Sequence, residues 1–216
     1  MYNPAHFTST DLSWLDWLAA SHAFGTLVSQ VDEAPFATHL PVLYRRSDSQ
    51  VVLSGHWARP NPQWRDIERQ RVLFMFQGPH AYISPRWYAD APKQVPTWNY
   101  IAAHVYGTIR AIHEGPELER IVIALAAQYE AGIPVPSANG APAAPWRLED
   151  ADPANRARLK GIVGFELRAD SVQLKLKLNQ NHPAANVLGA IAGLRETGSP
   201  EAAAVADLME KELARR

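Results

Sequence analysis

The stretch that decides the fold reads Phe76-Gln-Gly-Pro-His-Ala-Tyr-Ile-Ser-Pro-Arg-Trp-Tyr88 and resumes, after a short polar connection, as Val95-Pro-Thr-Trp-Asn-Tyr100. A strand pattern runs here into two dense clusters of glycine, proline, aromatic, hydroxyl and amide residues. Its prolines fix φ and remove backbone donors, so we expect particular turns. Its aromatic side chains with polar tips offer flat apolar surface with hydrogen-bonding ends. Rigid loops that carry such groups are typical of a site for a planar, partly polar ligand.

Strand-like segments lie on both sides of this stretch, at residues 25–31, 37–44, 51–56, 72–77, 98–113 and 162–178. Helices are expected after Thr10 or Asp11, over 62–69, from Gly115 to Tyr129, after Asp152 and from about Pro183 onward. Many short strands with antiparallel-compatible connections predict an all-β barrel with peripheral helices, a mainly β (α+β) fold. A doubly wound sheet is disfavoured because strands and helices do not alternate regularly and no Gly-rich turn opens a helix.

Composition narrows the class of protein. The 216 residues carry a net charge of −1, which is unlike the basic footprint of a nucleic-acid binder. The absence of cysteine excludes disulfides, thiolate metal sites and a cysteine nucleophile. Neither a signal peptide nor an apolar run of membrane-spanning length is visible, so we expect a soluble cytoplasmic protein without membrane association.

Histidine and serine patterns give no support for a metal site or a hydrolase. The 8 histidines show neither His-Glu-x-x-His spacing nor a tight cluster with carboxylates, so we predict no metal site. Ser84 precedes a proline and lies outside any Gly-x-Ser-x-Gly turn, which argues against a serine hydrolase.

An anion-binding cluster is suggested by Gly55-His-Trp-Ala-Arg-Pro-Asn-Pro-Gln-Trp64, between a predicted strand and a predicted helix. The planar cation of Arg59 suits bidentate binding of a phosphate. Ser54, His56 and Asn61 can add hydrogen bonds, and free amides at the start of the helix favour an anion. In the alternative interpretation, Asn61 caps the helix and Arg59 is a solvated surface charge.

A second polar cluster is Lys175-Leu-Lys-Leu-Asn-Gln-Asn181. Its alternation places Lys175, Lys177 and Asn179 on one face if the strand persists. A solvated edge strand guarded by lysines is the simplest interpretation, above all for Lys175. It explains the adjacent amides at 179–181 less well, because they have dense donor and acceptor capacity.

Several motifs in this order resemble the PaiB family, FMN-binding split-barrel proteins also described as negative transcriptional regulators. They are Met1-Tyr-x-Pro4, Ala37-Thr-His-Leu-Pro41, Gly55-His-x-Ala-Arg-x-Asn-Pro-Gln-Trp64, Phe76-Gln-Gly-Pro-His-Ala-Tyr-Ile-Ser-Pro85, Pro96-Thr-Trp-Asn-Tyr100 and Lys177-Leu-x-Gln-Asn181. The resemblance runs from Met1 to about Asn181. The family more often has serine at the position of Asn179, so a hydroxyl role there does not carry over.

The resemblance implies a six-stranded, pyridoxamine-phosphate-oxidase-like split β-barrel that binds FMN at a homodimer interface. Residues 1–181 would form the barrel domain, with an inserted helix and loop around 115–160, and residues 182–216 a helical segment packed on it. The phosphate would lie near residues 53–61, and the aromatic and amide motifs would surround the flavin ring. The implied cofactor-binding residues are Leu53, Ser54, His56, Ala58, Arg59, Asn61, Gln77, Trp98, Asn99, Lys177, Gln180 and Asn181.

Three functions remain open at this point. An FMN-dependent redox or flavin-sensing protein needs no acid, base or nucleophile of its own, because flavin supplies the chemistry for a small-molecule redox substrate that the sequence does not identify. A transcriptional regulator is implied by the family, although no DNA-binding motif or basic patch supports direct DNA contact. Haem binding or degradation on the same type of barrel rests on fold analogy alone. The segment 132–145, rich in proline, glycine and alanine, is predicted to be a mobile loop.

Overall fold

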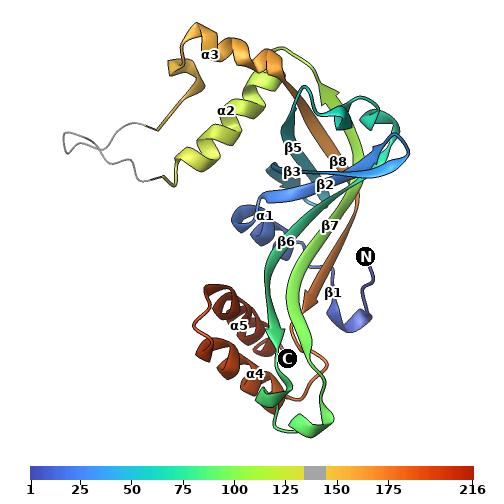
Figure 1. Ribbon diagram of the computed structural model, residues 1–216, viewed down its shortest axis with the longest axis vertical. Coiled ribbons are helices and arrows are strands. Elements are labelled where there is room, and N and C mark those ends of the chain that lie inside the picture. Colours follow the sequence, from blue (N-terminus) through green and yellow to red (C-terminus); the bar gives the residue numbers. More distant parts are fainter. Residues whose placement is uncertain (134–144) are drawn as a thin grey trace, which may run out of the picture. The chain divides into compact units, whose positions relative to one another are not determined.

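The computed structural model describes residues 1–133 and 145–216, which contain an eight-stranded sheet and accompanying helices (Figure 1). The strand order is β3-β2-β6-β7-β8-β5-β4, and β1 pairs with β8. The strands are β1 Thr8–Ser9, β2 Phe24–Val31, β3 Ala34–Pro41, β4 Leu43–Ser47, β5 Gln50–Ala58, β6 Arg71–Ile83, β7 Thr97–Ile112 and β8 Ile162–Lys177. The sheet therefore has more strands than the six that the family resemblance implies.

Helices account for most of the remaining regular structure. The α-helices are α1 Ser13–Ser21, α2 Pro116–Glu130, α3 Pro153–Ala157, α4 Ala184–Glu196 and α5 Pro200–Leu213. The 3₁₀ helices are η1 Ala5–Phe7, η2 Pro62–Trp64, η3 Ile67–Arg69, η4 Pro85–Trp87, η5 Ala91–Lys93, η6 Leu148–Asp150 and η7 Arg158–Gly161. No helix in these ranges is long and apolar enough to cross a membrane.

The chain divides into two compact units, and the long strands β6, β7 and β8 contribute to both. Unit 1 comprises Met1–Leu18, Phe76–His104 and Val172–Arg216. Unit 2 comprises Ala19–Met75 and Val105–Ser171. The domain division at residue 181 stays a prediction.

Unit 2 contains two antiparallel hairpins, β2–β3 and β4–β5. Asp32 and Glu33 adopt positive φ angles of 51° and 61° in the first turn, and Asp48 a φ of 53° in the second. These are the left-handed conformations that short hairpin turns require. Trp57 and Phe165, both almost completely buried, pack in the core with ring centroids 4.6 Å apart.

Helix α2 completes unit 2 and confirms the helix predicted to start at Gly115. Gly115 has a φ of 88°, a left-handed conformation that favours glycine, and Pro116 occupies the first helical turn. The buried face of α2 forms an apolar cluster with Ile112, against which Leu43 and Ile162 pack; the helical members are Leu118, Ile121 and Leu125. Since the leucine and isoleucine spacing is helical, this burial follows directly from the sequence pattern.

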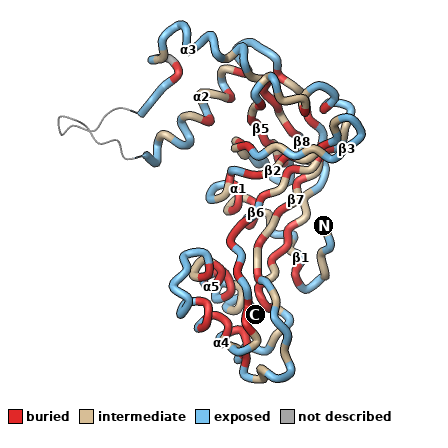
Figure 2. The backbone as a smooth tube through the Cα atoms, viewed as in Figure 1, coloured by how far each residue is buried: buried red, intermediate tan, exposed pale blue. Residues whose placement is uncertain are grey.

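Unit 1 contains the predicted C-terminal helices α4 and α5, each with one buried and one exposed face (Figure 2). Gly193 of α4 lies against the ring of Trp87, where an added Cβ would come within 2.3 Å of Cδ2. The small side chains of α4 thus allow this tryptophan to approach the helix backbone. Helix α1 buries Trp14, Leu15 and Leu18, and the Oδ1 of Asp11 accepts from the backbone N–H of Ser13.

Three boundary predictions were wrong. The strand predicted over 37–44 is two strands, because the chain turns at the fully buried Val42, whose N–H donates to the carbonyl of Ala23. The helix predicted over 62–69 is the pair of 3₁₀ helices η2 and η3. Residues 78–83, expected as loop, extend β6; Pro79 is tolerated there because the pairing of β6 with β2 ends at Met75. The loop predicted at 132–145 lies, apart from its ends, outside the described residues.

Candidate functional site

The predicted cofactor-binding residues fall into both units. Unit 2 holds those from the anion-binding cluster: Leu53, Ser54, His56, Ala58, Arg59 and Asn61. Unit 1 holds those from the aromatic and amide motifs: Gln77, Trp98, Asn99, Lys177, Gln180 and Asn181.

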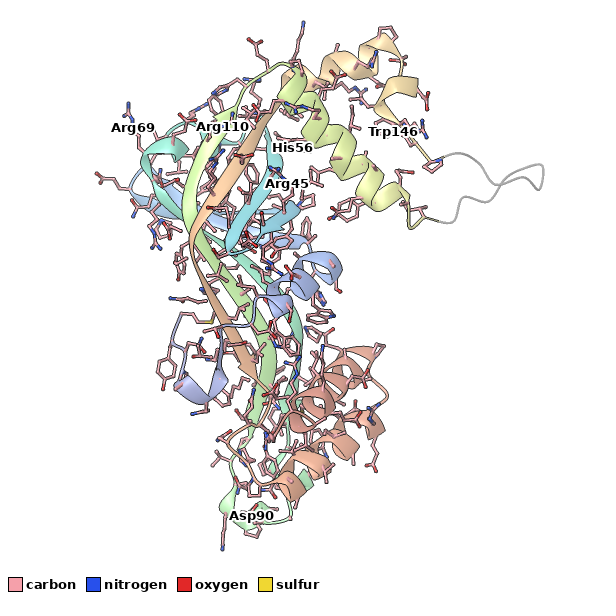
Figure 3. All side chains as sticks on the ribbon, turned by 180° about the vertical axis from the view of Figure 1, so that it is seen from behind. Arg45, His56, Arg69, Asp90, Arg110 and Trp146 are labelled. Carbon is pink, nitrogen blue, oxygen red and sulfur yellow. The ribbon has the colours of Figure 1, made fainter. Side chains whose placement is uncertain are left out.

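The side chain of His56 lies on the face of β5 that α2 covers. His56 pairs in register with Gly164, and a Cβ added to Gly164 would lie 2.8 Å from Cδ1 of Leu118 on α2. Directly opposed residues of antiparallel strands project to the same face. Figure 3 labels His56 and Arg45 beside this helix. Ser54 shares the face because it is two residues away on the same strand, and it is also buried.

His56 is half-buried, and one nitrogen of its imidazole is buried and unsatisfied. Its Nδ1 is inaccessible to solvent and has no hydrogen-bond partner among the described residues. Burial lowers the pKa of His56 below its ordinary value of 6.5, because desolvation disfavours the imidazolium. A neutral imidazole nitrogen left without a partner is the kind of group that a ligand can satisfy.

Arg59 is hydrogen-bonded to the backbone. Its Nε donates to the carbonyl of Lys160 at 2.6 Å, and its Nη2 donates to the carbonyls of His113 at 3.1 Å and Ile162 at 2.9 Å. The interpretation of Arg59 as a solvated surface charge was therefore wrong. Its assignment to a phosphate stays a prediction, for which Nη1 has donors with no partner in the described part of the chain.

Asn61 is a helix cap. Its Oδ1 accepts from the backbone N–H of Gln63 at 2.9 Å, and its Nδ2 donates to Oγ1 of Thr38 at 3.0 Å. This confirms the capping interpretation. Both polar atoms of the amide are engaged, so Asn61 offers less to a ligand than His56 does.

Gln63, which the sequence did not single out, holds the cluster together. It is 1% exposed and accepts from Nε1 of Trp57 at 3.0 Å. Its Nε2 donates to the carbonyl of Leu27 at 3.1 Å and to Oγ of Ser29 at 3.0 Å. The dense polarity of the motif is thus partly structural. The sequence pattern that could have pointed to Gln63 is its position in Pro60-Asn-Pro-Gln-Trp64, beside two prolines and a tryptophan.

Leu53 and Ala58, the two apolar residues predicted to bind the cofactor in unit 2, differ in burial. Leu53 is fully buried in the core of unit 2 and pairs with Leu167, so a ligand could reach at most its backbone. Ala58 is exposed at the end of β5, where it pairs with Ile162. Its small side chain leaves the space beside the strand end open.

In unit 1, Gln77 and Trp98 are both exposed. Trp98 is 53% exposed and lies with its ring centroid 6.1 Å from those of His80 and Tyr82. The aromatic group borders a hollow of about 670 Å³ whose walls include His80, Tyr82, Ser84, Arg86, Trp98 and Glu201. An exposed indole beside a hollow offers the flat apolar surface that the sequence predicted.

Asn99 is completely buried, and half of its amide is unsatisfied. Its Nδ2 lies 3.3 Å from the sulfur of Met209, while its Oδ1 has no partner among the described residues. Sulfur is a weak acceptor, so neither end of this amide makes a strong hydrogen bond. A buried amide in this state is costly unless a ligand supplies a donor.

The amides at 179–181 have three different environments. Asn179 is buried with a left-handed φ of 63°, and its Nδ2 donates to the hydroxyl of Tyr88 at 3.0 Å. Gln180 closes its own turn, because Oε1 accepts from the N–H of Leu178 and Nε2 donates to the carbonyl of Leu176. Asn181 is exposed and makes no side-chain hydrogen bond to another described residue. The first two therefore have structural roles, and the assignment of Gln180 and Asn181 to the cofactor stays a prediction.

Lys177 is half-buried, and its Nζ donates to Oγ1 of Thr97. Burial lowers the pKa of this ammonium, the charge of Lys175 lowers it further, and Tyr100 opposes the change. Lys175 is 7% exposed and donates to the carbonyl of Tyr2 at 3.0 Å. The interpretation of Lys175 as a solvated guard of an edge strand was wrong, because β1 pairs beside it and the N-terminal segment covers it.

The chemistry of these residues suits binding rather than acid–base catalysis. They offer buried neutral acceptors, amides, aromatic faces and cations. Within residues 1–133 and 145–216 no group of three or more histidine, aspartate or glutamate side chains is arranged to hold a metal ion.

The chain matches a known family model and a relative that covers nearly its whole length. Residues 1–171 match the family model described as "Putative FMN-binding domain". The chain is 37% identical over 214 residues to the protease synthase and sporulation protein PAI 2 of Bacillus subtilis strain 168, which covers 99% of this chain and 98% of the relative.

Solved structures share the fold at low sequence identity. The flavocytochrome Anf3 from Azotobacter vinelandii superposes with a TM-score of 0.58 and 11% identity, covering 79% of this chain and 69% of that chain. The FAD and haem binding protein from Mycobacterium smegmatis superposes with a TM-score of 0.55 and 17% identity, covering 85% of this chain and 79% of that chain. These likenesses confirm the predicted split-barrel fold, and the sequence matches confirm the predicted family. The chain therefore belongs to the PaiB family of FMN-binding split-barrel proteins.

Proposed function

We propose that this protein binds FMN as a homodimer and has a flavin-dependent redox or flavin-sensing role. In the described part of the chain, three buried side-chain polar atoms have no partner, and the observation that carries the proposal concerns two of them, Nδ1 of His56 and Oδ1 of Asn99; the third is Oδ1 of Asn3. Both belong to residues that the family resemblance assigns to the cofactor. Buried polar atoms in folded proteins are almost always satisfied, so a ligand group at each of them is the simplest completion.

Each unit, taken by itself, offers groups that suit one part of FMN. Ser54, His56 and Arg59 in unit 2 are a hydroxyl, a half-buried imidazole and a cation, a combination that suits a phosphate. In unit 1, Asn99 and Lys177 supply an unsatisfied acceptor and a donor cation, which suit the polar edge of a heteroaromatic ring. Trp98, on the opposite face of β7 from Asn99, offers an aromatic surface. When bound, flavin would supply hydride or electron transfer, and the protein supplies orientation and electrostatics.

A link to regulation is proposed from the relative in Bacillus subtilis, whose name is protease synthase and sporulation protein PAI 2. The net charge of −1 does not favour direct contact with DNA. A flavin-dependent protein could influence gene expression through a small molecule or a protein partner.

The absorbance spectrum of the freshly purified protein, with identification of any released cofactor, tests the proposal. We expect bound FMN, or stoichiometric uptake of FMN by the flavin-free protein. Uptake of haem in place of flavin, or of neither, would overturn it. Turnover with a reduced nicotinamide nucleotide and an electron acceptor then separates an enzyme from a sensor.

The variant Asn99→Leu tests whether Asn99 binds FMN. Replacing a poorly satisfied buried amide by an apolar group of similar shape is close to neutral for stability. We therefore expect a folded variant that binds FMN about tenfold more weakly, for the loss of a hydrogen bond of roughly 1.4 kcal/mol. Unchanged FMN affinity in titrations followed by flavin fluorescence would remove Asn99 from the site.

A further inference from the structure

Lys175 and Lys177 form a pair of ammonium groups on one face of β8, in unit 1. They are two residues apart on a strand, so their side chains project the same way with Cα atoms roughly 7 Å apart. The N-terminal segment runs alongside: β1 pairs with β8 at Thr8 and Lys175. This brings Tyr2 and Phe7 to the lysines.

Two aromatic rings lie near the ammonium group of Lys175, and one lies near that of Lys177. Nζ of Lys175 lies 5.5 Å from the ring centroid of Tyr2 and 5.3 Å from that of Tyr100. Nζ of Lys177 lies 6.0 Å from the ring centroid of Phe7. These distances are within the range of cation–π attraction, which stabilises part of the buried positive charge.

What this cluster lacks is an anion. Neither lysine lies within 4.0 Å of a carboxylate in the described part of the chain, although Lys175 is only 7% exposed. Each ammonium has three donors, and each makes one hydrogen bond, to the carbonyl of Tyr2 or the hydroxyl of Thr97. Two like charges held together away from water destabilise the folded protein unless an opposite charge compensates them.

We propose that Lys175 and Lys177 jointly bind the anionic group of a small molecule, a carboxylate or a phosphate, between the rings of Tyr2, Phe7 and Tyr100. The free ammonium donors hold the charge, and the rings provide apolar walls. The ligand is therefore an acidic molecule with a flat or apolar body. The lowered pKa of Lys177 agrees with this arrangement, because burial and the neighbouring charge of Lys175 are its causes. Lys177 is also one of the residues that the proposed function gives to FMN, so the phosphate of FMN is one candidate source of this anion.

Binding of inorganic phosphate to the flavin-free protein tests the proposal directly. Broadening of the ³¹P signal during a titration reports the affinity, and circular dichroism confirms that each variant is folded. We expect Lys177→Met to weaken phosphate binding by about tenfold or more, as for the loss of a charge-assisted hydrogen bond. Lys93→Met is the matched control, because Lys93 is an exposed lysine of the same unit.

Lys175→Met should have the same effect as Lys177→Met. If it fails to fold, Lys177→Gln provides the second measurement, because Lys177 is less buried. Equal phosphate affinity in the wild-type protein, Lys177→Met and Lys177→Gln would overturn the proposal.

The source of the anion is decided by repeating the titration with bound flavin. If FMN abolishes the part of phosphate binding that Lys177→Met also removes, and riboflavin does not, the lysines hold the phosphate of the flavin. If phosphate still binds beside FMN, they hold the acidic group of a substrate or effector. Failure of the protein to bind any flavin leaves the phosphate titration intact, so the two proposals fail separately.

Discussion

The guanidinium of Arg59 joins the end of β5 to the chain entering β8, through the carbonyls of Lys160 and Ile162, and also reaches the carbonyl of His113. The sequence left two alternatives open for Arg59, a phosphate ligand and a solvated surface charge. The structure adds a third role, which neither alternative contained. Arginine can serve two roles at once because its fork carries five donors.

Arg59→Ala is predicted to affect both stability and ligand binding. Loss of hydrogen bonds from a charged, half-exposed donor should lower the free energy of unfolding by about 2 kcal/mol. If Nη1 also meets the phosphate, FMN should bind on the order of ten- to a hundredfold more weakly, whereas riboflavin should change little. Urea denaturation and fluorescence titration of both flavins measure the two effects.

Riboflavin and Arg65→Ala are the controls for this prediction. Arg65 is an exposed arginine of the same loop region, and it should leave both measurements unchanged. Equal weakening of FMN and riboflavin by Arg59→Ala would indicate general damage to the site. A less stable variant with unchanged FMN affinity would make Arg59 purely structural.

His56 predicts a pH dependence of stability. Its pKa in the folded protein is lowered from 6.5 by burial, so between the two pKa values the unfolded chain binds more protons. The stability that neutral His56 contributes is therefore complete above about pH 6.5 and is lost as the pH falls from there through the folded pKa. Urea denaturation at a series of pH values should show a shallower decline for His56→Gln than for the wild-type protein.

Two other histidines also contribute to the loss of stability at low pH. Burial also lowers the pKa values of His104 and His182, so part of the acid sensitivity should remain in His56→Gln. Identical pH profiles for the variant and the wild-type protein would contradict the assignment of a buried neutral imidazole at position 56.

At the scale of elements, the long and strongly patterned segments were predictable. The apolar alternation of 101–109 gave β7, and the spacing of Leu118, Ile121 and Leu125 gave the buried face of α2. The extension of β6 through Gly78 and Pro79 was not predictable, because proline normally ends a central strand. Proline is tolerated there because the pairing of β6 with β2 ends at Met75, and this end point is set by the tertiary structure.

The candidate site was predictable as a set of residues but not as a set of roles. Helix-cap chemistry identified Asn61 correctly, because capping is local. Gln63 and Lys175 were missed or misread because their environments are made by residues distant in sequence, such as Leu27 and Tyr2. Periodicity places a side chain on a face; it does not say what covers that face.

Leu118→Ala tests the packing of α2 on its strands. Leu118 is 3% exposed and contacts the position of Gly164, so its truncation should lower the free energy of unfolding by about 2–4 kcal/mol. Arg120→Ala, on the exposed face of the same helix, should change it by less than about 0.5 kcal/mol. Urea denaturation measures both. Similar effects of the two substitutions would mean that α2 is not held by this apolar face.

At the scale of the whole molecule, the proposal of a homodimer joins the assembly state to the cofactor. Isologous dimers are the commonest soluble assemblies, and exposed aromatic side chains such as Trp98 and Tyr82 are typical of interface residues. The family resemblance adds that flavin lies between the subunits. If so, flavin is part of the interface, and its binding must be linked thermodynamically to association.

This linkage is the sharpest test of the assembly. We expect light scattering to show a dimer at micromolar concentration, and dilution of the flavin-free protein to produce monomer at a higher concentration than dilution of the FMN-bound protein. The direction follows because a ligand that binds only the dimer shifts the equilibrium toward it by mass action. A monomer at micromolar concentration contradicts the dimer itself. If the protein is a dimer but FMN does not change its dissociation, the homodimer is supported and the placement of flavin between the subunits is contradicted. Each chain would then bind its cofactor alone.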